Sequence, residues 1–237
     1  MKIIQHRLYR DDGAAYPFIP SPNFGGEIQH EFLVIHYTAG RDAQSAINWL
    51  IDPERKVSAH LVIGRDGGIT QLVPFDKIAW HAGRSEWKGF INLNQYSIGI
   101  ELDNAGFLTR HNNPLAPHLS DCRLSIVDCR LKRQTIINHQ SSIINQQSRW
   151  LSWLKDEYDN SEVIEAVHKH ETEPRGWHTF TPEQIEVALG VSKLLVNHYN
   201  LRDVVGHDDI APGRKLDPGP AFPMENFRAC LFEGLEC

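Results

Sequence analysis

Histidine and acidic residues give this chain its clearest chemical signal. The sequence contains 13 histidines, and imidazole both binds metal ions and carries protons near neutral pH. His36 ends a short apolar run, whereas His207 and Asp217 lie in a later segment rich in proline and glycine. Two imidazoles and one carboxylate suit Zn²⁺ and leave a fourth position for water. Many such triples can be drawn from this composition, so spacing alone does not establish a site, but each of these residues lies where a predicted strand passes into a loop.

Two further charged residues could act beside such a metal. Glu101 belongs to the segment Ser97–Leu102, where apolar and polar residues alternate as in a half-buried strand. If that strand pairs beside the one that ends at His36, Glu101 faces the same site. Lys215 precedes Asp217 by two residues and points to the same side if that stretch is extended.

A sheet must position these residues, and the apolar runs predict one. The expected fold class is α/β, with a mixed central β-sheet flanked by helices in a single domain. A Gly-Gly pair at 67–68 marks a hairpin, because glycine provides the positive φ that tight turns require. Asp42 and Thr181 are expected to cap helices, the second supported by Pro182 and Gln184. Strands are expected at residues 32–35, 60–63, 69–73, 97–102 and 204–206, and helices at 43–51 and 182–200.

Two regions depart from this regular pattern. Residues 1–26 are expected to form an irregular N-terminal arm, because the second half of that range is dense in proline, glycine and aspartate. The main domain then spans 27–237 and contains an insertion at about 107–180. Within the insertion, aromatic and leucine residues between Trp150 and Tyr158 suggest an amphipathic helix. Residues 110–149 show no sustained period; they carry six Lys and Arg against two Asp, a net +4, so the rest of the chain carries -10.

The composition excludes several classes of protein. The chain has 237 residues, 41% hydrophobic and 23% charged, which is typical of globular proteins whose core needs no disulfide or metal to fold. A net charge of -6 and a pI near 6.1 argue against nucleic-acid binding. A mean hydropathy of -0.39 and the lack of a long apolar run argue against a membrane span. No signal peptide is recognised, so we expect a cytoplasmic monomer whose four cysteines are reduced.

Six segments of the chain resemble one enzyme family. They are FLVIHYTAG, SAHLVIGRDG, AWHAGRS, SIGIELDNAG, TPEQIEVAL and VVGHDDIAPGRKLDPGPAFP. Together, and in this order, they resemble the zinc-dependent N-acetylmuramoyl-L-alanine amidases of the amidase-2 type. That family includes anhydro-muropeptide amidases, phage amidase-lysozymes and peptidoglycan recognition proteins. The resemblance covers about residues 27–106 and 180–223, and the last segment is the most specific.

The resemblance implies an activity and a role for each residue named above. The activity is hydrolysis of the amide between the lactyl group of N-acetylmuramic acid and L-alanine of the stem peptide. His36, His207 and Asp217 would bind Zn²⁺, Glu101 would handle the water proton, and Lys215 would steady the developing oxyanion. The implied partners are peptidoglycan fragments or anhydro-muropeptides.

The expected substrate contacts are His60, Trp80, His81, Arg84 and Asn104. Phage and recognition-protein relatives carry a tyrosine where Ala59 stands here, so His60 either substitutes for it or packs as an ordinary strand residue. Trp80 and His81 would form a stacking platform and a polar contact, unless they are a buried Trp and a neighbour bonded to the backbone. Arg84 and Asn104 would contact the stem peptide, although a surface Arg and a turn Asn need no ligand.

Several alternatives stay open at this stage. A non-catalytic peptidoglycan-binding module is the second functional hypothesis, because some recognition proteins keep the fold and lose a metal ligand. The substrate could be soluble anhydro-muropeptide or intact wall, and the protein could be exported without a signal as a phage lysin or effector. Residues 110–149 are either a solvated excursion or a basic segment that attracts anionic wall polymer or stem-peptide carboxylates.

Overall fold

The central sheet has the strand order β16-β4-β10-β5-β6 in the computed structural model, which describes residues 1–112 and 148–232. β16, β4, β10 and β5 run parallel to their neighbours, and β6 pairs antiparallel with β5. The mixed sheet expected from the sequence is confirmed, with its strands close to their predicted positions. Its members are β4 (Phe32–Tyr37), β5 (Leu61–Ile63), β6 (Ile69–Gln71), β10 (Ser97–Leu102) and β16 (Asp203–Gly206).

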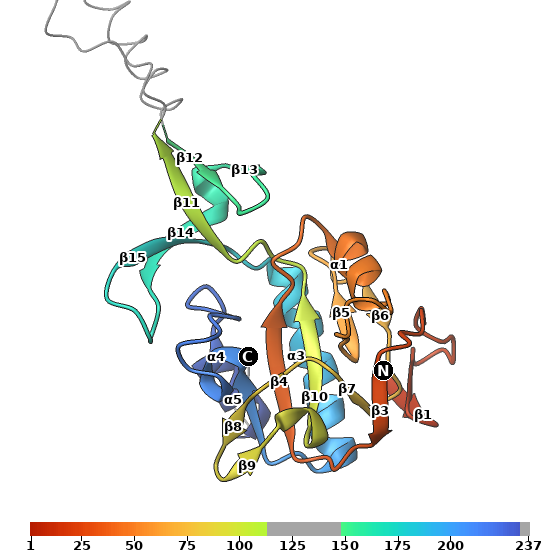
Figure 1. Ribbon diagram of the computed structural model, residues 1–237. Coiled ribbons are helices and arrows are strands. Elements are labelled where there is room, and N and C mark those ends of the chain that lie inside the picture. The colour runs from red at the N-terminus through yellow and green to blue at the C-terminus, as the bar shows by residue number, and fades with distance from the viewer. Residues whose placement is uncertain (113–147, 233–237) are drawn as a thin grey trace, which may run out of the picture.

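The main core lies between this sheet and α3 (Pro182–Tyr199), which runs behind β4 and β10 in Figure 1. Ile35, Ile100 and Leu195 are fully buried in it. Thr181 caps α3 by accepting the Gln184 N–H at 3.1 Å. The Gln184 side chain donates to the carbonyl oxygen of Ile63, at the end of β5, so the helix start is fixed to the sheet.

The first helix, α1 (Ala43–Leu50), also starts where the sequence predicts it. Asp42 accepts the Ser45 N–H at 2.7 Å, and the Ser45 hydroxyl in turn accepts the N–H of Asp42. Ile47 and Leu50 lie on the buried face of this helix. α1 follows β4 directly, so its cap fixes the loop that leaves the carboxyl end of that strand.

The N-terminal arm is more regular than expected. β1 (Lys2–Ile4) pairs with β2 (Arg7–Tyr9), and Leu8 is fully buried in the main core. β3 (Phe24–Glu27) pairs with β7 (Lys77–Ala79). The prediction of an irregular arm is therefore wrong for these stretches, because pairing with distant segments supplies the order that local composition does not.

A second, wholly antiparallel sheet occupies the predicted insertion, with the order β13-β12-β11-β15-β14. Four residues connect the end of β10 to the start of β11, and Figure 1 shows the sheet extending away from that end of the central sheet. Its members are β11 (Phe107–Asn112), β12 (Ser148–Leu151), β13 (Glu157–Tyr158), β14 (Val163–Val167) and β15 (Pro174–His178), with the 3-10 turn η4 (Asn160–Glu162) between β13 and β14.

The helix predicted between Trp150 and Tyr158 is wrong. β12 and β13 pair through Trp150 and Tyr158, and the Trp150 ring covers Gly176, where a Cβ would lie 2.4 Å from Cζ3. The apolar spacing of this stretch fits a helical face, but it fits two short strands around a turn as well. Pairing with β11 decides between them, which no local pattern reports.

Most of the basic stretch 110–149 lies outside the described residues, so the expectation attached to it remains a prediction. Its two described ends are paired within the second sheet. Arg110 contacts Glu165 at 3.0 Å, and Arg149 contacts Glu157. These two cations are therefore neutralised locally.

The C-terminal part contains α4 (His207–Ile210), inside the expected loop, and α5 (Met224–Phe232). Cys230 is disulfide-bonded, so the prediction of reduced cysteines is wrong for this residue. That prediction was based on the missing export signal, whereas a disulfide depends on which thiols meet in space.

Within the described ranges, no helix has the length and apolar character needed to cross a bilayer. The remaining elements are β8 (Glu86–Trp87), β9 (Phe90–Ile91) and η1 (Leu93–Gln95).

Candidate metal centre

Three buried side chains converge at the carboxyl ends of the central strands. His36 Nδ1, His207 Nδ1 and Asp217 Oδ2 lie 2.9 Å from one another in each pairing. Their exposed fractions are 1%, 3% and 7%. The structure thus brings together the three residues that the sequence singled out, although they are spread over most of the chain.

Sheet register explains this convergence. β16 runs parallel to β4 with Gly206 opposite Ile35, so His207, the next residue, emerges beside His36. Asp217 returns to the same point because the Asp208 N–H donates to the Asp217 carbonyl oxygen at 2.8 Å. The Asp217-Pro218 peptide bond is cis.

The outer ring nitrogens fix which atoms face the centre. His207 Nε2 lies 3.1 Å from the Ala82 carbonyl oxygen, so it carries the proton and donates it. His81 Nε2 donates to the Ser97 carbonyl oxygen, which leaves His81 Nδ1 to accept from His36 Nε2 at 2.9 Å. In their neutral forms, His36 and His207 therefore each present an unprotonated Nδ1 to the Asp217 carboxylate. Three electron-pair donors at this separation repel one another unless a cation lies between them, and the donor set is one that zinc prefers.

The electrostatics of the group agree with this arrangement. Burial, together with the neighbouring His207, lowers the pKa of His36 to about 4, so the imidazole is neutral at pH 7. Neutral imidazole and ionised carboxylate are the forms that bind metal.

Glu101 lies directly beside the cluster, on the neighbouring strand. β10 pairs with β4 so that Glu101 is opposite His36, as the alternation of the sequence suggested. Its Oε2 is buried and has no hydrogen-bond partner among the described residues. Burial and the negative charge of Asp217 raise the pKa of Glu101, and Lys215 partly offsets this. A buried carboxyl group with a raised pKa, beside a candidate metal centre, is a candidate proton carrier.

A cleft of about 340 Å³ opens onto the cluster, and three of the predicted residues line it together with His207: Trp80, His81 and Lys215. Trp80 is half-buried in its wall. Most of His81 is buried, and its Nδ1 accepts a hydrogen bond from His36 Nε2 that holds the His36 ring in place. The cleft is large enough for part of an elongated ligand.

The other predicted substrate contacts lie elsewhere. His60 is fully buried, with Nδ1 accepting the Gly99 N–H and Nε2 bonded to the Lys77 carbonyl oxygen. The alternative of a packed strand residue therefore describes it. The Asn104 amide is buried and donates to the carbonyl oxygens of His178 and Thr179. Arg84 is exposed and does not line the cleft.

Two further residues, not expected from the sequence, shape the cleft. Asn94 Oδ1 accepts the N–H groups of His81 and Ala82 at 3.0 and 2.7 Å. Arg214 donates to the carbonyl oxygens of Ala82 and Arg84 at 2.8 and 2.7 Å. Arg214 precedes Lys215 in the most specific segment, which was the available signal; Asn94 had none.

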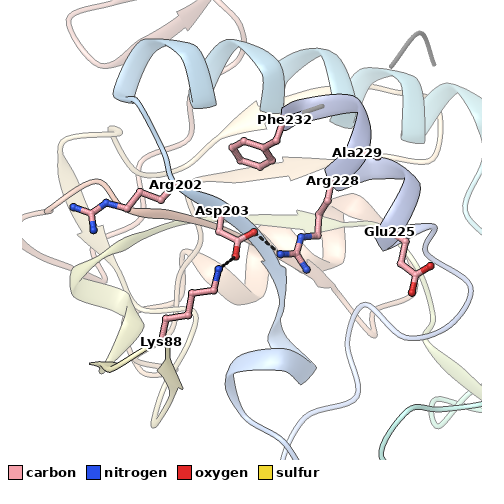
Figure 2. Close-up of a pocket in the computed structure, with 7 residues that line it drawn as sticks. All are labelled: Lys88, Arg202, Asp203, Glu225, Arg228, Ala229 and Phe232. Carbon is pink, nitrogen blue, oxygen red and sulfur yellow. Dashed lines mark hydrogen bonds and ion pairs between the residues drawn. The ribbon is translucent and has the colours of Figure 1, made fainter. Parts of the chain in front are cut away.

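A larger cavity, about 450 Å³, lies at the opposite end of β16 (Figure 2). Lys88 and Arg228 point toward the buried carboxylate of Asp203 and lie 2.9 and 2.7 Å from it. Asp203 begins β16, whereas His207 follows the end of that strand. The central charges of this cavity are paired with each other, so the cluster at His36 remains the candidate for chemistry.

A family model described as N-acetylmuramoyl-L-alanine amidase matches residues 26–220. The matched range includes both sheets and all three clustered residues. The chain is 30% identical to the N-acetylmuramoyl-L-alanine amidase AmiD of Escherichia coli over 225 residues, covering 91% of this chain and 54% of AmiD. It therefore spans about half the length of that relative.

Two further comparisons add to this one. The first covers most of the relative's length, and the second is with a structure that contains a ligand. The chain is 27% identical to the 1,6-anhydro-N-acetylmuramyl-L-alanine amidase AmpD of Escherichia coli over 235 residues, covering 90% of each chain. It also matches a solved structure of Escherichia coli AmiD in complex with anhydro-N-acetylmuramic acid-L-Ala-D-gamma-Glu-L-Lys, at a TM-score of 0.52 and 28% identity, covering 92% of this chain and 59% of that one.

Proposed function

Because the chain belongs to the N-acetylmuramoyl-L-alanine amidase family, we propose that it is a zinc-dependent hydrolase of the amide bond between N-acetylmuramic acid and L-alanine. The observation that carries this proposal is the convergence of two imidazole Nδ1 atoms and one carboxylate oxygen, 2.9 Å from one another in each pairing. A Zn²⁺ ion held by His36, His207 and Asp217 would polarise the scissile carbonyl and acidify water.

Glu101 is proposed to move the proton. Its side chain faces the same site as His36, and its buried Oε2 is left without a partner among the described residues. It would accept a proton from the attacking water and deliver it to the amine of L-alanine as that group departs. The raised pKa of Glu101 suits the second half of this task, because the carboxyl group keeps the proton that it has accepted until the departing amine takes it.

Lys215 and Trp80 are proposed to act on the substrate side. Lys215 lines the cleft beside His207, where a fixed positive charge would offset the charge that builds on the tetrahedral oxygen. Trp80 forms part of the cleft wall, where its ring can pack against a sugar or peptide.

The proposed substrate is a soluble anhydro-muropeptide. Supporting this choice are the similarity to AmpD over 90% of both chains and the ligand in the matched AmiD complex. The expected cytoplasmic location stays a prediction. Fractionation of cells followed by immunodetection addresses that question separately.

Parallel digestion tests the proposed function. Purified protein is incubated with anhydro-muropeptide and with intact peptidoglycan, and the products are identified by mass spectrometry. We expect free stem peptide and anhydro-N-acetylmuramic acid from the soluble substrate, about one zinc per chain, and no release by His36→Ala. Binding of either substrate without release of peptide would instead favour a binding module.

A further inference from the structure

A turn of the second sheet holds the segment that follows His207. Residues 168–173 connect β14 to β15, and His168 Nε2 lies 3.0 Å from Asp208 Oδ2. Because His168 Nδ1 accepts the His170 N–H at 3.2 Å, Nε2 carries the proton and donates it to Asp208. Both side chains are buried. The carboxylate next to His207 is thus bound by a residue from the other sheet.

The same turn makes further contacts with Asp208 and Asp209. Lys169 Nζ lies 2.9 Å from Asp208 Oδ1 and 2.6 Å from Asp209 Oδ1. His170 Nε2 lies 2.9 Å from the Asp208 carbonyl oxygen. Asp208 is only 4% exposed, and a buried carboxylate is costly without partners. These partners therefore restrict where the Asp208 backbone can lie.

A second contact reaches the residues after Asp217. The Trp177 ring of β15 covers Gly219, where a Cβ would lie 2.7 Å from Cζ3. Trp177 is 1% exposed, donates through Nε1 to the Ala166 carbonyl oxygen at 3.0 Å, and stacks on His168 with centroids 5.6 Å apart. The ring that supports His168 therefore also packs against the Asp217 side of the site.

We propose that His168, Lys169 and Trp177 are positioning residues for His207 and Asp217, so that the second sheet helps set the geometry of the metal site. The inference rests on the proposed function, because it takes the clustered residues as metal ligands. The Asp208 N–H donates to the Asp217 carbonyl oxygen. A displacement of Asp208 would therefore move His207, its covalent neighbour, and Asp217, its hydrogen-bond partner, together.

The test compares three variants by metal binding rather than activity. His168→Ala removes the donor to Asp208. His168→Gln keeps an N–H near the position of Nε2. Arg110→Ala, in the same sheet, removes an exposed ion pair with Glu165 that does not touch α4. Zinc affinity is measured by competition with a chromophoric chelator, and ligand geometry by the visible spectrum of the Co²⁺-substituted protein.

We expect His168→Ala to bind zinc about 10- to 100-fold more weakly, as is usual when an outer partner of a metal site is lost, and to shift the Co²⁺ bands. His168→Gln should restore most of both, and Arg110→Ala should match the wild type. The proposal is overturned if His168→Ala folds and keeps wild-type affinity and spectrum, or if Arg110→Ala changes them equally.

Lys169→Met provides the same comparison if His168→Ala does not fold, because Lys169 is 41% exposed and the methionine preserves its length. A loss of zinc affinity of up to about 10-fold with altered Co²⁺ bands supports the proposal, and wild-type values for both overturn it. A wild-type protein that binds no zinc would contradict the proposed function itself, which is a different result from unchanged binding in the variants.

Discussion

The central sheet and the second sheet contribute differently to one site. The central sheet places His36, His207 and Glu101 at adjacent carboxyl ends of parallel strands, where register alone brings them together. The second sheet supplies no member of the cluster, yet its β14–β15 turn and Trp177 contact the segments on both sides of Asp217. The chemistry and its alignment therefore come from separate elements, and substitutions should separate them.

The largest effect should come from the ligands of the central region. His36→Ala is expected to lose both bound zinc and more than about 1000-fold in kcat/KM, because activation of water would go with the metal. The fold should persist, since the main core lies on the other face of the sheet. Metal analysis, circular dichroism and turnover measure the three quantities. A metal-free His36→Ala with full activity would rule out the proposed chemistry.

The next effect separates proton transfer from metal binding within the central sheet. Glu101→Gln should keep zinc and lose about 100- to 10,000-fold in kcat, the usual contribution of a positioned acid or base. Glu165→Gln, an exposed carboxylate of the second sheet, is the matched control and should retain turnover. Loss of metal in Glu101→Gln would make Glu101 a ligand and place the assignment of Asp217 in doubt.

A smaller effect is expected at the aromatic wall of the cleft. Trp80→Ala should raise KM about 3- to 10-fold with little change in kcat, since an aromatic contact contributes about 0.5–1.5 kcal/mol beyond its buried area. Trp153→Ala is the control from the second sheet, because that ring is 62% exposed and does not line the cleft. Equal KM values for the two variants would show that Trp80 packs against the fold and not against substrate.

The same division between sheets decides what the sequence could predict. The strands of the central sheet are short apolar runs ended by polar residues, so their positions follow from local pattern. The pairing of Glu101 beside His36 was only a condition in the sequence, and the register of the two strands supplies it. In the second sheet, the strand that contains Trp150 is set by a partner far along the chain, because Trp150 pairs with Arg110. A stretch whose order depends on such pairing was therefore misread as a helix.

Besides long-range strand pairing, local pattern could not predict the hydrogen-bond partners of buried polar side chains. For His60 and Asn104 the sequence left open whether they face substrate or pack in the fold, and backbone groups of Gly99 and His178 bond to their polar atoms. The contact between His168 and Asp208 joins residues 40 positions apart and has no counterpart in spacing or composition. Residue type shows what chemistry a side chain can do, and only the fold shows which partner it meets.

The last expected difference between the sheets concerns how folding stability depends on pH. His178, on β15, is buried, accepts the Ala105 N–H through Nδ1, and has no partner for Nε2 among the described residues. Burial, with a contribution from Arg65, lowers its pKa from 6.5 to about 3. Below pH 6.5 the unfolded chain therefore binds a proton that the folded chain does not. Stability contributed by the neutral ring is present above pH 6.5 and is lost as the pH falls toward 3.

His178→Asn tests this, because an asparagine oxygen can accept the same Ala105 N–H without titrating. Between pH 6.5 and 4 the unfolding free energy of the wild type should fall more steeply than that of the variant, by up to about 1.4 kcal/mol per pH unit. Urea titrations at fixed ionic strength measure both slopes. His60→Asn, in the central sheet, should flatten the slope only down to about pH 4, where the pKa of His60 lies. Parallel curves for wild type and His178→Asn would mean that this imidazole is already paired or hydrated in the folded protein.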